Sequence, residues 1–255
     1  VIRMERTSAE LKRLAREKLA GHWGLVIGAI LLQALIVVAI LLPFEFLFIF
    51  SGGGMVQFVA YLVAAMILGI ISTIMQCGIT RMMLCFARGQ QAGIGMMFGE
   101  FTKRPDRYIV GTLLMFGIEM ACLLPGSLCW LVGVLQGRML ANVIGATLYL
   151  AGAVVMVVIF LRYGLVFFLL VDDPQMGALE AFRESARLMD GRKGRLFYIG
   201  LSFIGMYLLG VCSCGLGMLW VTPYTEQTLV SFYLDTIGEL DRMQKETYAG
   251  EGMPF

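Results

Sequence analysis

The sequence has little charge for its length. Only 15% of its 255 residues are Asp, Glu, Lys or Arg, whereas 59% are hydrophobic, and the mean hydropathy is +0.82. A soluble domain usually carries about 25% charged residues. Several apolar runs reach the roughly 20 helical residues that cross a bilayer core about 30 Å thick. The composition therefore excludes an ordinary soluble domain and predicts an integral membrane protein.

The sequence also lacks the patterns that carry catalysis or metal binding. Its six cysteines show no CxxC spacing, and its single histidine, His22, stands beside Trp23 without a second imidazole. GxSxG, HExxH and P-loop motifs are absent. We therefore expect a non-enzymatic protein with no catalytic residues, no cofactor and no metal. The expected partners are the lipid bilayer and a protein partner or second copy of the chain, not nucleic acid.

Apolar runs are abundant, and they predict an all-α, polytopic membrane bundle of six transmembrane helices. Five runs cover about residues 24–50, 56–80, 108–132, 143–171 and 196–212, with a turn at "SGGG" after the first. Pro125 and Gly126 should bend the third. The sixth, more polar stretch lies within 215–240. The expected domains are an amphipathic N-terminal helix in 1–23, a membrane domain in 24–238 and a tail in 239–255.

Basic residues predict the orientation of these spans. With six crossings, 18 of the 20 Lys and Arg residues fall on the side of the N-terminus, Arg138 falls on the other side and Arg162 falls within a span. Short loops rich in Lys and Arg stay in the cytoplasm. Both termini, including the tail 239–255, are therefore expected to be cytoplasmic.

Two amphipathic helices are expected at the cytoplasmic surface. The first follows a capping-box pair, Thr7 and Glu10, and the second, about 174–190, starts at Asp173 and Pro174 and ends near Gly191. Their apolar positions recur at helical spacing: Leu11, Leu14, Ala15 and Leu19 in the first, and Leu179, Phe182, Ala186 and Met189 in the second. Each precedes a GxxG and a span, which indicates either an old duplication or simply a flexible helix end.

Ionisable residues within the spans form the candidate polar site. Counted from the cytoplasmic ends of straight helices, Arg162 lies about 14 Å deep, Glu119 about 16 Å and Glu226 about 17 Å. A charge at the bilayer centre costs at least about 2.5–3.5 kcal/mol, so these side chains should face the bundle and find partners. We expect Arg162 to pair with Glu226, with Glu119 as the competing acid. Glu45 should lie near the outer interface.

Two stretches of the chain resemble a known family. "ELKRLAREKLAGHWGLVIG", near the front, and the run from Arg162 and Tyr163 to Asp235, with its DxPxxxALEAxRxSxxLMxG pattern, resemble the bacterial integral membrane family known as domain of unknown function 975. The resemblance implies six spans in a bacterial cytoplasmic membrane, since Pro223 to Asp235 matches the family's last helix. It implies no activity. The middle departs from the family by an extra stretch, about 128–148.

Two functions remain open on this basis. An intramembrane site of Arg162, Tyr163, Glu226 and Glu119 favours a transport component with an Arg/Glu pair. The alternative is a structural or accessory protein that acts through its cytoplasmic amphipathic helices in envelope or lipid physiology. The pattern is also similar to membrane regions attached to bacterial glycerophosphodiester phosphodiesterases. A transporter needs a wet, polar cavity beside the Arg/Glu pair, whereas an accessory protein buries the pair in dry packing.

The expected pairing of Arg162 with Glu226 has a thermodynamic test. Because either partner alone is a buried uncompensated charge, Arg162→Met or Glu226→Gln should each destabilise the protein by about 3–5 kcal/mol. The double variant should be much less destabilised, which a double-mutant cycle of detergent unfolding measures. Additive effects of the two substitutions would contradict the pairing.

Overall fold

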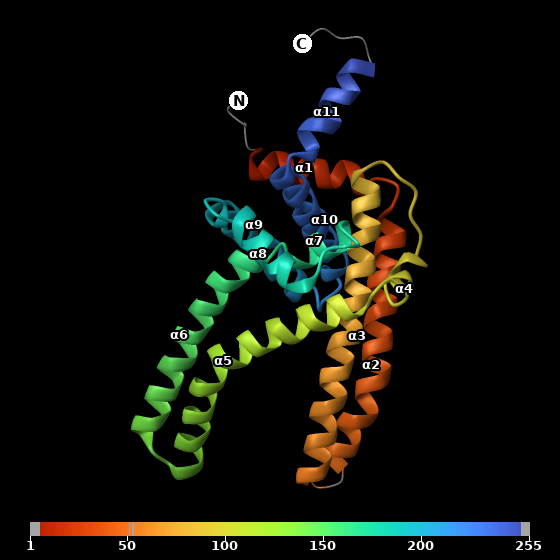
Figure 1. The fold of residues 1–255 in the computed structure, drawn as a ribbon. Coiled ribbons are helices and arrows are strands. Elements are labelled where there is room, and N and C mark those ends of the chain that lie inside the picture. Colours follow the sequence, from red (N-terminus) through yellow and green to blue (C-terminus); the bar gives the residue numbers. More distant parts are fainter. Residues whose placement is uncertain (1–5, 51, 53, 251–255) are drawn as a thin grey trace. The chain divides into compact units, whose positions relative to one another are not determined.

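A computed structural model describes residues 6–50, 52 and 54–250 of the chain, and these residues confirm the all-α expectation. They form helices and no strand. The helices are α1 (Ser8–Leu19), α2 (Trp23–Phe50), α3 (Met55–Ala87), α4 (Met96–Gly99), α5 (Asp106–Gln136), α6 (Met139–Tyr163), α7 (Val166–Asp172), α8 (Ala178–Leu188), α9 (Lys193–Cys212), α10 (Met218–Ile237) and α11 (Glu239–Gly250) (Figure 1).

The described residues divide into two compact units. Unit 1 contains the residues up to Pro105, the short piece 171–174 and the residues from Gly194 onward; unit 2 contains 106–170 and 175–193. Unit 1 thus holds α1 to α4 and α9 to α11, and unit 2 holds the α5–α6 pair and α8.

Five stretches in the described residues are long and apolar enough to cross a membrane. They are α2, α3, α5, the stretch Met139–Asp172 and α9. The stretch expected as a sixth span forms α10, a 20-residue helix that is more polar and is not among these five. A sixth crossing therefore stays a prediction. The expected fourth span is not one straight helix, because a turn at Gly164 and Leu165 separates α6 from α7. In the expected "SGGG" turn, residues 51 and 53 lie outside the described residues.

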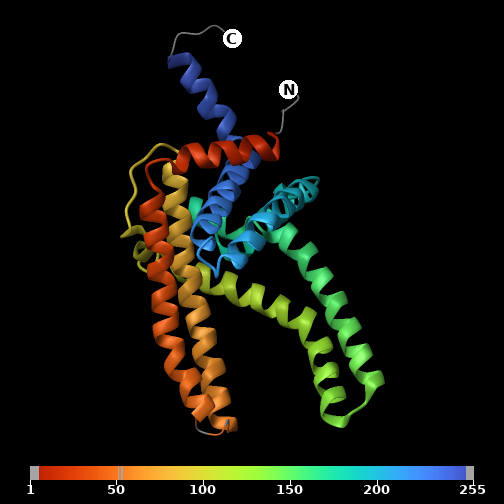
Figure 2. The same ribbon diagram turned by 180° about the vertical axis from the view of Figure 1, so that it is seen from behind.

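Helices α2 and α3 run antiparallel, side by side along their length (Figures 1 and 2). Near the middle, the amide of Gln33 donates to the carbonyl oxygen of Ser72 at 3.0 Å and to its hydroxyl at 2.9 Å. Toward the turn, the rings of Phe48 and Phe58 lie 6.0 Å apart. The two contacts fix one register for the hairpin, which we call the α2–α3 hairpin.

Helix α1 is capped as expected but buries its apolar stripe against protein. The Thr7 hydroxyl accepts from the backbone N–H of Glu10, and the Glu10 carboxylate accepts from the backbone N–H of Thr7. The hydrogen bonds that the carboxylate accepts from the backbone N–H and the hydroxyl of Thr7 lower the pKa of the Glu10 carboxyl. Helix α1 packs on α10. Three residues of its apolar stripe have no exposed surface: Leu11, Ala15 and Leu19. This stripe is therefore not free to enter lipid.

Helix α8 begins later than its sequence predicts. It starts at Ala178 after Gly177, while Pro174 lies in a turn, so the expected start at Asp173 and Pro174 is wrong. Its protein-facing side consists of small residues and one methionine: Ala178, Ala181, Ser185 and Met189. Phe182 packs on Tyr163 with ring centroids 5.1 Å apart. Leu179, expected to face lipid or the ends of the spans, is 60% exposed.

The resemblance between the two amphipathic segments extends to their structure. Gly21 and Gly191 both adopt positive φ, +84° and +76°, which glycine tolerates best. When these glycines are aligned, five buried positions coincide: Leu11 with Ala181, Ala15 with Ser185, Leu19 with Met189, Val26 with Leu196, and Ala29 with Ile199. A helix end explains the glycine but not the matched burial, which favours a duplication.

Glycines bring α5 and α6 into close contact in unit 2. A Cβ at Gly126 would overlap the backbone of Tyr149, one at Gly145 the backbone of Trp130, and one at Gly152 the backbone of Cys122. Small residues let membrane helices approach closely and gain van der Waals contact. The extra stretch 128–148 is the end of this α5–α6 hairpin. Helix α5 bends along its length (Figure 1), as expected for a helix containing Pro125.

This close approach predicts unequal effects of two similar substitutions. Gly145→Ala should destabilise the protein by about 1–3 kcal/mol, because the added methyl group overlaps backbone that cannot move aside cheaply. Gly117→Ala is the matched control on α5, since nothing lies within 4 Å of a Cβ there. Thermal unfolding of the purified chain in detergent measures both. Equal melting temperatures would contradict the tight helix contact.

Candidate functional site

A network of ion pairs lies where α10 ends and α11 begins in unit 1. Three arginines contribute to it, from the segment before α1, the end of α3 and the first turn of α9: Arg6, Arg88 and Arg195. Four acids contribute from the end of α7, α10 and α11: Asp172, Asp235, Glu239 and Asp241. We call these seven residues the α10 ion network.

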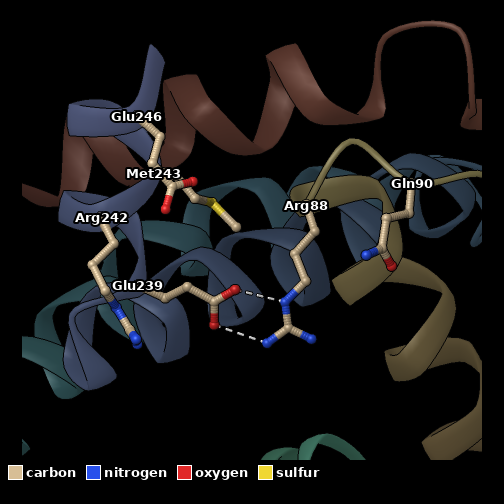
Figure 3. A pocket seen from close by; sticks show the side chains of 6 residues that line it. All are labelled: Arg88, Gln90, Glu239, Arg242, Met243 and Glu246. Atoms are coloured by element: carbon tan, nitrogen blue, oxygen red, sulfur yellow. Dashed lines mark hydrogen bonds and ion pairs between the residues drawn. The ribbon is translucent and has the colours of Figure 1, made fainter. Parts of the chain in front are cut away.

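Arg88 binds two of the acids at once. Its Nε and Nη2 donate to the two oxygens of Glu239 at 2.7 and 2.8 Å (Figure 3), and Nη2 lies 2.7 Å from Asp172. The Tyr233 hydroxyl donates to the second oxygen of Asp172 at 2.8 Å. The bidentate hydrogen bond from Arg88 lowers the pKa of the Glu239 carboxyl. The planar guanidinium therefore fixes α11 and Asp172 against the end of α3.

Asp235 is the most buried acid of the network, with 4% of its side chain exposed. Its two oxygens accept from Arg195 at 2.5 Å and from Arg6 at 2.8 Å. Arg6 also donates to Asp241 at 2.8 Å. A carboxylate this buried is stable only when its charge is compensated. Asp235 therefore ties the N-terminal segment and α9 to α10.

A second buried pair attaches the segment after α3 to that helix. Glu100 is fully buried and lies 2.5 Å from the guanidinium of Arg81. Arg81 also donates to the carbonyl oxygen of Val171 at 2.7 Å. Gly78 allows this packing, because a Cβ there would lie 2.5 Å from Met97 in α4. The polar segment between α3 and α5 is thus folded back on α3.

Unit 2 has its own buried arginine. Arg107, 2% exposed, donates to the carbonyl oxygens of Leu170 and Met176, each at 3.1 Å. The Ser185 hydroxyl of α8 donates to the carbonyl oxygen of Arg162 at 3.1 Å. These bonds fix the chain on both sides of the turn that precedes α8.

The residues of the expected intramembrane site belong to both units: Arg162, Tyr163 and Glu119 to unit 2, and Glu226 to unit 1. Arg162 lies exposed in the last turn of α6, with its guanidinium 5.8 Å from the ring of Tyr163. The depth calculated for it assumed a continuous helix to residue 171, which the turn after Tyr163 interrupts. Glu119 is exposed on α5. Because Arg162 and Glu226 belong to different units, their pairing stays a prediction.

Two adjacent polar residues of α10 have unused hydrogen-bonding capacity. Glu226 is half-buried, and within the described part of the chain it has no hydrogen bond or ion pair. Gln227 is fully buried; its amide nitrogen donates to the carbonyl oxygen of Met83 at 3.4 Å, while its side-chain oxygen has no partner in the described residues. Such groups are costly in an apolar bundle.

Sequence reasoning missed the α10 ion network. The positions of its three arginines predicted only the orientation of the chain, and its four acids had no predicted role in a site. One signal was present, because the stretch that resembles the family's last helix contains both Tyr233 and Asp235. That pattern was used to count spans rather than to identify a site.

A polar pocket adjoins the network. It has a volume of about 490 Å³ and is lined by Arg88, Gln90, Glu239, Arg242, Met243 and Glu246 (Figure 3). No group of three or more His, Cys, Asp or Glu residues suited to a metal ion occurs in 6–50, 52 and 54–250. With each of its acids paired to an arginine, the network is suited to holding segments in place.

The five long apolar stretches of the described residues are consistent with a polytopic α-helical membrane protein. Comparison with family models identifies it further: the chain belongs to the family described as "Protein of unknown function (DUF975)", whose model matches residues 4–239. This match confirms the resemblance seen in the sequence. No curated protein and no solved structure matches the chain.

The lowered pKa of Glu239 predicts a pH-dependent stability. Charge-assisted hydrogen bonds contribute about 1.5–3 kcal/mol, so Glu239→Gln should lower the melting temperature at pH 7. A group whose pKa is lower in the folded state stabilises the fold above its unfolded pKa, about 4.3, and this contribution disappears as the pH falls through the folded pKa.

The measurement is thermal unfolding of both proteins from pH 7 down to pH 3. The difference in melting temperature should shrink as the solution is acidified. Glu246→Gln is the matched control, because this exposed acid lines the same pocket without an ion pair to Arg88. A difference that stays constant with pH would contradict the role given to Glu239.

Proposed function

We propose that this is a non-enzymatic accessory protein of the bacterial cytoplasmic membrane. The observation that supports it most is the α10 ion network, in which charged residues from six segments pair with one another. A network of this kind makes one end of unit 1 a rigid platform for a partner, with the polar pocket beside Arg88 at its surface. Both termini are cytoplasmic in this proposal, as the distribution of basic residues indicates.

The internal pairing favours this function over transport. A permeation pathway needs charged groups that exchange partners with a substrate during each cycle. In unit 1, Asp235 is instead held by two arginines and Asp172 by Arg88 and Tyr233. Exchanging these contacts would leave buried charges uncompensated, which costs several kcal/mol. Groups so constrained are better suited to structure than to conduction.

The proposal includes α10 as a sixth crossing. Its 20 residues match the thickness of a bilayer core, and four of its hydroxyl side chains donate to carbonyl oxygens four residues earlier: Thr225, Thr228, Ser231 and Thr236. A hydroxyl satisfied by its own helix loses most of its cost in lipid. The polar composition of α10 is therefore compatible with insertion.

Transport remains a second candidate because of Glu226 and Gln227. Their unused polar atoms on a central helix are the type of group that binds ions or substrates inside membranes. An Arg162–Glu226 pair would then be part of the pathway. Whether water reaches Glu226 distinguishes the two functions.

Cysteine accessibility tests the proposal. After replacement of the six native cysteines, Thr222→Cys or Leu229→Cys places a thiol on the same face of α10 as Glu226 and leaves that acid intact. An accessory protein with dry packing should show no reaction with a small, water-soluble thiol reagent in intact cells or opened membranes. Reaction in opened membranes as fast as at a surface control would favour transport instead.

Two control positions calibrate the labelling. Leu140→Cys lies at the end of the α5–α6 hairpin, where the residue is 73% exposed, and should react in intact cells. Glu180→Cys on α8 should react only after the membranes are opened. The reverse pattern at these two positions would overturn the proposed orientation.

A further inference from the structure

A small pocket with aromatic walls lies near the turn of the α2–α3 hairpin. It has a volume of about 240 Å³ and is lined by Glu45, Phe48, Ile49, Phe58 and Tyr61. Glu45 and Phe48 are one helical turn apart on α2, and Phe58 and Tyr61 are one turn apart on α3. The ring of Phe48 lies 6.0 Å from Phe58 and 6.4 Å from Tyr61. The hairpin register thus gathers three rings and one carboxylate.

Glu45 has no compensating charge in this pocket. It is exposed on α2, and within the described ranges it forms no hydrogen bond or ion pair. Glu45 is therefore unlike the acids of the α10 ion network, each of which is held by arginine. An uncompensated carboxylate in an apolar hairpin is unfavourable, so a cation from outside the chain would be stabilised beside it.

The chemistry of the pocket selects an organic cation. The faces of aromatic rings attract cations and repel anions, and a carboxylate acts in the same direction. A divalent metal ion prefers six or more oxygen ligands, whereas this pocket offers one carboxylate and one phenol. Ammonium groups are large and require no fixed coordination geometry, so they suit a pocket of aromatic rings that contains a carboxylate.

An apolar pocket adjoins the first and indicates where the cation comes from. It has a volume of about 710 Å³, shares Glu45 and Ile49 with the aromatic pocket, and is otherwise lined by apolar residues: Ala39, Leu42, Pro43, Phe46 and Leu47. A hydrocarbon chain fits such a surface by the hydrophobic effect. A molecule with an ammonium group attached to acyl chains would occupy both pockets.

We propose that Glu45, Phe48, Phe58 and Tyr61 form a cage for the ammonium headgroup of a membrane lipid, with an acyl chain of the same lipid lying in the adjoining apolar pocket. The site lies near the hairpin turn and therefore at the end of the span, where lipid headgroups meet the hydrocarbon core. This inference is independent of the proposed accessory function, because it uses none of the residues of the α10 ion network.

Binding of short-chain lipids to the purified full-length chain in detergent tests the cage. Dihexanoyl phosphatidylethanolamine should bind at least about tenfold more tightly than dihexanoyl phosphatidylglycerol, which has no ammonium group. Glu45→Gln should remove this preference, and Tyr61→Leu should reduce it. Titration calorimetry measures the affinities. Equal affinities for the two lipids, or an unchanged preference in Glu45→Gln, would overturn the proposal.

Free tetramethylammonium distinguishes a lipid from a soluble cation. It should bind far more weakly than the ethanolamine lipid, since it has no chain for the apolar pocket; equal binding would overturn the assignment to a lipid. Glu180→Gln and Phe116→Leu are matched controls on exposed positions of α8 and α5, and both should keep the preference. The comparison of the two lipids on the unaltered chain needs no variant. The test therefore stays decisive even if a variant fails to fold.

Discussion

Three acids at the end of α10 and the start of α11 impose the main constraint on unit 1. The carbonyl end of a helix carries partial negative charge and is stabilised by cations. The last turn of α10 instead contains Asp235, and Glu239 and Asp241 follow it in the first turn of α11. Arginines must therefore reach this point from elsewhere. They come from before α1, from the end of α3 and from the start of α9, and their convergence determines where those segments pack.

The spans were predictable and the ion network was not, for one physical reason. Membrane crossing depends on the summed apolarity of about 20 consecutive residues, which a single segment contains in full. Ion pairing depends on residues that folding brings together, and Arg6 and Asp235 are 229 positions apart. The predicted start of α8 is wrong for the same reason. Asp173 and Pro174 satisfy the local rule for a helix start, but Arg107, more than 60 positions earlier, binds the carbonyl oxygens of Leu170 and Met176 on either side of them, and the helix begins at Ala178.

Glycines show the same division between local and tertiary information. Gly117 and Gly145 both lie in apolar, membrane-length helices, and their surroundings in the sequence do not separate them. In the fold, nothing approaches a Cβ at Gly117, whereas the backbone of Trp130 occupies the place of one at Gly145. The sequence resemblance between the two amphipathic segments was visible beforehand, but only the matched burial distinguishes duplication from a shared helix end.

The acids of the α10 ion network form a first group, from which Glu45 differs in what its surroundings provide. At the end of α10, folding brings arginines to every acid of the network, so the charges are used up in holding segments together. Glu45, on a hairpin whose neighbouring side chains are aromatic or aliphatic, has no such partner among the described residues. Removing an acid of the first group exposes an arginine and weakens the fold, whereas neutralising Glu45 removes a charge that the fold does not use. An acid that contributes nothing to its own fold is free to select a ligand, because binding a cation there breaks no existing contact.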